Sequence, residues 1–178
     1  MAANFAIPPS PFPFGYLLMP NNLGFRSGHV VLHKFRVEST SVIAPGDMVY
    51  LDETVVRPAS ELPWNTDLAT TQQDFADMFV GIAHEASADG EDAAVSIDVS
   101  SSSIYEFDVT SSSYDNGNLL APEGASSKLL NQQLAYVNTP SQAIARAAEF
   151  SDQMTSRLRV MFASAYSTGS TNSNAAIG

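Results

Sequence analysis

Residues 93–109, AAVSIDVSSSSIYEFDV, alternate apolar and polar side chains on both sides of a serine-rich break. Successive side chains of a β-strand point to opposite faces, so this pattern predicts two half-buried strands, Ala93–Val99 and Ile104–Val109. Long amphipathic helical patterns are missing from the rest of the sequence. The stretch therefore predicts a mainly β fold rather than a helix bundle or a Rossmann fold.

Short segments rich in β-branched and aromatic residues precede this stretch. We expect them to form strands at His29–Val37, Asp47–Leu51, Val55–Pro58 and Phe79–Glu85. Turn residues separate them, and we expect turns at Ile43–Gly46 and Ser87–Asp92, a loop over residues 59–74 and one helical turn over Asp74–Met78. Many short strands with frequent turns predict a compact β-barrel or β-clip-like domain.

The second half of the chain repeats elements of the first half without a fixed period. Gly117–Leu120 is similar to Gly46–Val49. Two further pairs are Ala143–Ala147 with Gly81–Glu85, and Leu158–Phe162 with Val95–Val99. The repetition predicts two similar lobes within one domain, with a short helix over Ser126–Leu134 between them.

The chain is expected to consist of an N-terminal arm at residues 1–27, a β-rich domain at 28–166 and a flexible tail at 167–178. The arm holds five of the ten prolines, so it is expected to be extended. It is also rich in aromatic residues, namely Phe5, Phe12, Phe14, Tyr16 and Phe25. Such an arm either folds back on its own domain or contacts a neighbouring subunit or partner.

Composition argues against several classes of partner. The net charge is −11, from 19 acidic and 8 basic residues, and no run of Lys or Arg occurs. Phosphate backbones and anionic membrane surfaces attract basic patches, so neither nucleic acid nor a membrane is an expected partner. The chain has no cysteine, which excludes disulfides and thiolate chemistry.

The sequence offers few candidates for catalysis or metal binding. His29 and His33 are four residues apart, which in a strand separates them by roughly 13 Å, too far for one metal ion. His84–Glu85 could suggest acid–base chemistry, but no nucleophile lies at a recognisable spacing. We expect no catalytic residues, no metal site and no cofactor.

One set of strings resembles a known family. Ala44–Leu51, APGDMVYL, is followed by Phe79–Ala86, FVGIAHEA, then by Asp89–Glu91 and by Val95–Val99. This order resembles the small decoration (cement) proteins of tailed-bacteriophage capsids, whose pattern is G-D-x-V-x-L, F-V-G-I-A, a G-E turn and V-x-V. The resemblance covers residues 44–99 directly and 117–162 more loosely, while the loop at 58–74 and the long arm depart from it.

The resemblance implies a structural protein on the outer surface of a virion. It implies a homotrimer that binds the major capsid protein at three-fold positions of the lattice. The aromatic residues of the arm are then candidate contacts with the capsid or with a neighbouring subunit. The alternatives are a head-fibre, tail or receptor-binding component of a virion, a hydrolytic or metal-dependent enzyme, and an unrelated β-barrel binding protein.

Overall fold

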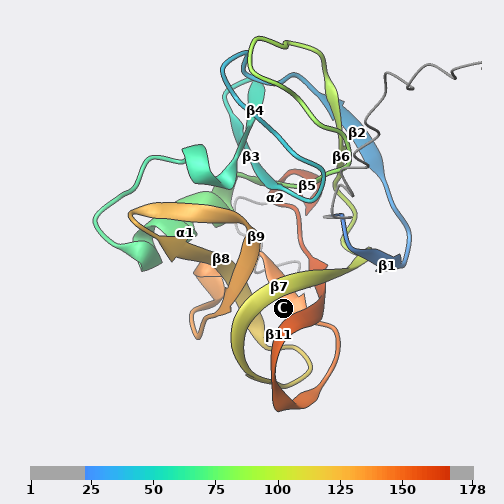
Figure 1. The fold of residues 1–178 in the computed structure, drawn as a ribbon, viewed down its shortest axis with the longest axis vertical. Coiled ribbons are helices and arrows are strands. Elements are labelled where there is room, and N and C mark those ends of the chain that lie inside the picture. Colours follow the sequence, from blue (N-terminus) through green and yellow to red (C-terminus); the bar gives the residue numbers. More distant parts are fainter. Residues whose placement is uncertain (1–22, 169–178) are drawn as a thin grey trace, which may run out of the picture.

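The computed structural model describes residues 23–168 of the chain. These residues form two lobes, each built on a curled five-stranded sheet, with short helices between them (Figure 1). Lobe one, residues 32–98, lies at the top of the view, and lobe two, residues 104–162, lies at the bottom. The predicted mainly β, barrel-like domain with two similar lobes is confirmed.

Lobe one contains the strands β2 (Leu32–Phe35), β3 (Met48–Asp52), β4 (Val55–Pro58), β5 (Phe79–Ala83) and β6 (Val95–Asp98). They pair in the order β2-β6-β5-β3-β4, and all neighbours are antiparallel. The two ends of the sheet meet at one parallel bridge between Val37 and Val56. Lobe one therefore curls until its edges touch.

Lobe two contains the strands β7 (Ile104–Tyr114), β8 (Leu119–Ala125), β9 (Lys128–Tyr136), β10 (Ala145–Ala147) and β11 (Ser151–Phe162). Their order, β7-β11-β10-β8-β9, repeats that of lobe one strand for strand. A parallel pairing of β7 with β9 closes this sheet into a barrel. One additional strand, β1 (Phe25–Ser27), pairs with β7.

An equivalent backbone hydrogen bond holds the first turn of each lobe. The amide of Gly46 donates to the carbonyl of Ala83 at 2.8 Å, and the amide of Gly117 donates to that of Ala147 at 2.9 Å. Both glycines have positive φ, 95° and 84°, which glycine adopts without steric cost. The similarity between Gly46–Val49 and Gly117–Leu120 thus reflects one turn used twice.

A side chain caps each of these turns in the same way. An oxygen of Asp47 accepts the amide of Ala44 at 2.9 Å, and Oδ1 of Asn118 accepts the amide of Asp115 at 2.9 Å. Asp and Asn commonly hydrogen-bond to nearby backbone in turns, which favours the reversal of the chain. The predicted turn at Ile43–Gly46 is therefore present.

The strand registers test the other two predicted similarities. Ala83 pairs with Ile97 and Ala147 pairs with Val160, so these pairs are equivalent. The match of Leu158–Phe162 with Val95–Val99 agrees with this register. The match of Ala143 with Gly81 is wrong by two residues, because a shift of two keeps every side chain on its face and the sequence pattern does not detect it.

Two predictions about helices are wrong. Residues 59–74, expected as a loop, contain a 3₁₀-helix (Ala59–Glu61) and most of α1 (Leu68–Met78). Helix α1 is longer than the expected single turn because Asp67 caps its N-terminus, accepting the amide of Thr70 at 2.8 Å. It packs its buried face between the lobes.

The expected helix at Ser126–Leu134 is instead the hairpin of β8 and β9. Ser126 and Ser127 have φ values of 51° and 57°, and the flanking residues Ala125 and Lys128 pair. A two-residue turn with two positive φ values matches the twist of antiparallel strands. The remaining helices are a 3₁₀-helix at Pro140–Gln142 and α2 at Ala165–Thr168.

Several strand boundaries also differ from expectation. The strand expected at His29–Val37 is confined to β2, and the strand expected at Ile104–Val109 continues to Tyr114. The extension pairs with β11, whose first residue, Ser151, lies opposite Tyr114. Together the two strands form a long ribbon that protrudes from lobe two (Figure 1).

The outer face of lobe one closes one end of lobe two. Rings form a continuous series from Tyr50 through Phe75 of α1 and Phe79 to Phe162 inside lobe two, with centroid separations of 5.7–6.0 Å. All four residues are buried. Aromatic pairs at such separations add to the stabilisation from burial, so the two lobes share one core.

The expected domain boundaries lie near the limits of the described residues. Residues 25–27 of the expected arm form β1, and the expected domain end at residue 166 falls inside α2. The rest of the arm, residues 1–22, and the tail from residue 169 lie outside the described residues.

Candidate interaction surface

Of the five aromatic residues expected to form contacts, only Phe25 is among the described residues. Phe5, Phe12, Phe14 and Tyr16 lie outside them. The ring of Phe25 packs edge-on against Tyr105 of lobe two, with centroids 5.7 Å apart, and the residue is 37% exposed. Phe25 therefore anchors the chain to its own domain on one side and presents its other side to solvent.

Tight backbone contact holds β1 in place. A Cβ added to Gly24 would lie 2.2 Å from the carbonyl oxygen of Glu106, so only glycine permits this approach. The amide of Glu106 donates to the carbonyl of Gly24 at 2.8 Å, and Arg26 forms an ion pair with the Glu106 carboxylate at 3.0 Å. The end of the arm thus leaves the domain from a defined point beside β7.

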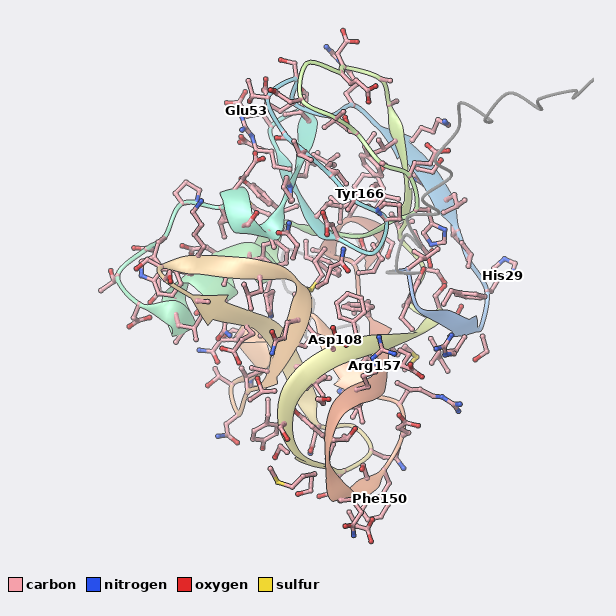
Figure 2. All side chains as sticks on the ribbon, in the orientation of Figure 1. His29, Glu53, Asp108, Phe150, Arg157 and Tyr166 are labelled. Carbon is pink, nitrogen blue, oxygen red and sulfur yellow. The ribbon has the colours of Figure 1, made fainter. Side chains whose placement is uncertain are left out.

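A hollow lies beside β2, at the end of lobe one. Its wall includes an aromatic group in which Tyr166 of α2 packs against His33 and Phe35, with centroids 5.9 Å and 5.1 Å away. Val31 and Tyr166, which line the hollow, are 37% and 47% exposed. Figure 2 shows Tyr166 beside the strands of lobe one. We call this feature the lobe-one hollow; it is lined by Val31, His33, Val99, Ser100, Ser101, Tyr166 and Ser167.

The ribbon of β7 and β11 carries two large apolar side chains near its end. Phe150 is 61% exposed and Met154 is 73% exposed. Phe150 lies at the bottom of the molecule, far from Tyr166 (Figure 2). Residues such as these are enriched where proteins bind one another, which makes this ribbon tip a second candidate contact.

A buried polar network joins the two lobes. The hydroxyl of Tyr105 donates to Oδ2 of Asp98 at 2.5 Å and lies 2.8 Å from Nε2 of His84. Because the hydroxyl proton is used by Asp98, Nε2 of His84 is the donor in the second bond. Oδ1 of Asp98 accepts the amides of Val31 and Ser100, so the carboxylate is fully bonded although it is only 3% exposed.

The electrostatics of this network favour a neutral imidazole. Burial lowers the pKa of His84, while the nearby charges of Asp98 and Glu85 oppose this effect. Burial, followed by the bond to Asp98, raises the pKa of Tyr105, so its hydroxyl stays protonated. The network links β6 to β7, and the hydrogen bond to Tyr105 gives the side chain of His84 a structural role.

The second residue of the suggested acid–base pair has other contacts. A carboxylate oxygen of Glu85 accepts the amide of Ser96 at 2.9 Å and lies 3.5 Å from Nζ of Lys34. The hydrogen bonds from Ser96 lower the pKa of Glu85. His84 and Glu85 thus belong to different sets of contacts.

We expect the stability of the protein to fall as the pH is lowered below about 6.5, the unfolded pKa of histidine. Since burial lowers the pKa of His84 in the folded chain, the unfolded chain binds its proton first, and the penalty grows until the folded pKa is reached. For this partly exposed residue the effect should be at most about 1 kcal/mol. Urea unfolding at pH 7.5 and 5.5 measures it, and a His84→Gln variant should lose less stability between the two pH values than the wild type. An equal loss in both proteins would contradict this assignment.

A second polar contact between the lobes involves the turn of lobe one. Oδ1 of Asp47 accepts Nε2 of Gln132 at 2.7 Å, and Oδ1 of Asn131 accepts the amide of Ser60 at 2.7 Å. Burial raises the pKa of Asp47, opposed by hydrogen bonds from Ala44 and Gln132. Strand β9 of lobe two therefore contacts Asp47, which caps the turn predicted at Ile43–Gly46.

Within residues 23–168, His, Asp and Glu side chains do not gather in groups of three or more that could hold a metal ion. In the same part of the chain, no helix is long and apolar enough to cross a bilayer.

No family model matches the chain, and no curated protein matches it in sequence.

The candidate surface contains residues that the sequence analysis did not single out. Val31 and Tyr166 come from segments 135 residues apart, and only the folded chain brings them to one hollow. Phe150 and Met154 carried a weak signal, because each is a large apolar residue between polar or charged neighbours in a strand or turn. The ribbon tip could have been found from that signal, whereas the hollow could not.

Proposed function

We propose that this chain is a structural virion protein that decorates and stabilises the outside of a tailed-phage capsid, binding as a homotrimer at three-fold positions of the lattice. The strongest support is the presence of large apolar side chains on the surface of an acidic chain, most clearly Phe150 and Met154 at the ribbon tip. Side chains of this kind lose little by being exposed singly, but together they suit contact with another protein.

The residues that carry the resemblance support the proposal through the fold. Asp47 caps the turn before β3 and contacts β9, and Gly81 lies in the wholly buried β5. The same turn recurs at Gly117–Asn118 in lobe two. Asp47 and Gly81 of this pattern thus shape a lobe, and we place the contacts with a capsid on residues outside the pattern.

Multivalency explains how modest contacts can suffice. A specific protein interface buries about 1,200–2,000 Å² in total. A trimer that contacts several capsid subunits at once converts later contacts into intramolecular ones, so the overall affinity greatly exceeds that of a single contact. A ribbon tip that extends from a double lobe with a shared core suits this role (Figure 1).

The proposal can be tested with capsids of the tailed phage that carries this gene, freed of the protein and mixed with purified full-length chain. We expect co-sedimentation that saturates at three chains per three-fold position, and capsids that resist heating better after binding. Capsids that neither bind the folded protein nor gain stability would overturn the proposal. Binding of glycans by the protein alone would favour a receptor-binding virion component instead.

Two double variants separate the contributions of the arm and the ribbon tip. We expect Phe12→Ala with Phe14→Ala, and separately Phe150→Ala with Met154→Ala, to weaken capsid binding about tenfold or more, since buried aromatic anchors dominate such interfaces. Sedimentation titrations measure both variants. Val42→Ala is the control, because Val42 is 58% exposed in lobe one and belongs to neither group. Unchanged binding by one double variant would remove that segment from the contact.

A further inference from the structure

The contact between the two lobes buries a row of residues on lobe one, whereas the equivalent row on lobe two takes no part in it. On the outer face of lobe one, Met48, Ile82 and Asp98 form a row across β3, β5 and β6, because Met48 pairs with Ile82 and Ile82 pairs with Asp98. These residues are 0%, 1% and 3% exposed. The row is covered by lobe two, whose Tyr105 reaches Asp98 from the end of its barrel.

The same row exists on lobe two, but the described residues leave it partly open. The register places Leu119 beside Arg146 and Arg146 beside Met161, at positions equivalent to Met48, Ile82 and Asp98. Leu119 and Arg146 are half-buried and Met161 is 37% exposed. We call Leu119, Arg146 and Met161 the lobe-two row.

One polar atom in the lobe-two row lacks a partner within the described part of the chain. Nε of Arg146 is buried and has no hydrogen-bond partner among residues 23–168. Leaving a buried donor unsatisfied is costly, and more so when the group is charged. A face with two apolar side chains around such an atom gains from being covered by a partner that supplies an acceptor.

The complementary surface is also present, at the end of lobe one. The registers Phe35–Val95 and Phe107–Leu158 make Phe35 equivalent to Phe107, and therefore His33 equivalent to Tyr105. Tyr105 is the residue through which the end of lobe two meets the row of lobe one. His33, in contrast, is exposed and lines the lobe-one hollow.

We propose that a second copy of this chain docks here, with the lobe-two row of one copy seated on the lobe-one hollow of the next. The contact repeats between chains the way in which the two lobes meet within one chain. It is head-to-tail, so it joins different surfaces of the two copies and closes into a ring when the rotation permits. This docking rests on the homotrimer of the proposed function. Three chains of two lobes each would then form a ring of six lobes.

The chemistry of the two surfaces is compatible. Met161 brings a thioether toward His33 and Tyr166, and contacts between sulfur and aromatic rings are favourable. The hydroxyls of Ser100, Ser101 and Tyr166 at the hollow supply acceptors for Arg146. Val31 and Leu119 would lose exposed apolar area on docking.

The experiment measures the native mass of the full-length chain with Met161→Lys, and with Val42→Lys as a control, because Val42 is also an exposed apolar residue and belongs to neither surface. We expect the wild type and Val42→Lys to show three times the chain mass of 19.0 kDa, and Met161→Lys to show 19.0 kDa with an unchanged circular dichroism spectrum. A Met161→Lys protein that remains trimeric would overturn the assigned interface, while leaving the trimer and the capsid role in place.

A second variant tests the head-to-tail arrangement. Val31→Lys alters the hollow but keeps the row, so this variant should also be monomeric. An equimolar mixture of Val31→Lys and Met161→Lys retains one intact row and one intact hollow, and it should form heterodimers but no closed trimers. A mixture that stays monomeric would overturn the pairing of these two surfaces.

The wild-type mass separates this inference from the proposed function. A wild-type monomer that still saturates capsids would overturn the ring and keep the capsid role. A wild-type monomer that becomes oligomeric when residues 1–22 are deleted would show that the arm of the same chain covers the row, which also overturns docking by a second copy.

Discussion

Replacing Gly81 by Ala should destabilise the protein by about 3 kcal/mol or more, the largest effect that we expect from removing or adding a single methyl group. A Cβ at this position would lie 1.9 Å from the carbonyl oxygen of Asp98 and 3.1 Å from a methyl carbon of Ile97. The oxygen belongs to the backbone of β6, which pairs with β5 through Ile82 and Asp98, so it cannot move without breaking that pairing. Denaturant unfolding monitored by circular dichroism measures the loss.

Gly90→Ala serves as the control for Gly81→Ala. Gly90 has a φ of 85°, but nothing lies within 4 Å of an added Cβ, so only the conformational cost of the left-handed region applies. That cost is roughly 1–2 kcal/mol. If Gly81→Ala were no more destabilising than Gly90→Ala, the close approach of β5 and β6 would not limit this position.

Gly81 also shows why the internal similarity was visible in the sequence without being exact. Its equivalent in lobe two is Ala145, which pairs with Phe162. The strand spacing of lobe two at that point leaves room for a Cβ, whereas that of lobe one does not. Side chains thus diverge where the lobes pack differently, while the Gly46 and Gly117 turns stay similar because both need a positive φ.

The fold class could be predicted because strand alternation is a local property of the chain. Val95, Ile97 and Val99 point into lobe one, as their spacing predicts. Helix α1 was mostly missed because Asp67 and Thr70 look like ordinary loop residues until the cap forms. Local patterns thus gave the strands, and the elements that depend on caps and turn geometry were harder to predict.

The candidate surface depends on contacts that no local pattern encodes. Arg146 looks like a normal outward-facing residue of a short strand. That its Nε lacks a partner among the described residues follows only from the packing of lobe two. His33 was considered as a metal ligand, whereas its position at the lobe-one hollow follows from its equivalence to Tyr105. The unmatched surfaces follow from the strand-by-strand equivalence of the two lobes, which no single segment of the sequence encodes.

Replacing Tyr105 by Phe should cost about 2–3 kcal/mol, because the hydroxyl bonds a buried carboxylate and bonds to charged groups contribute about 1.5–3 kcal/mol. The variant leaves Oδ2 of Asp98 and Nε2 of His84 without the partner that now lies between them. Tyr114→Phe is a matched control on the same strand, since Tyr114 is also buried and its hydroxyl donates to the neutral carbonyl of Thr110. That change should cost only about 0.5–1.5 kcal/mol.

Chemical unfolding of the two Phe variants at pH 7.5 decides whether the network holds the lobes together. If Tyr105→Phe unfolds at the same denaturant concentration as Tyr114→Phe, the Asp98 carboxylate contributes no more than a neutral acceptor would, and the link between the lobes rests on the aromatic series alone. If Tyr105→Phe is clearly less stable, then the only hydroxyl that crosses from lobe two to Asp98 among the described residues is a principal tie between the repeated units. The position equivalent to Tyr105 in lobe one is His33, which has no such carboxylate opposite it within the described part of the chain. One junction is therefore complete within a single chain, and a second copy completes the other in the docking that we propose.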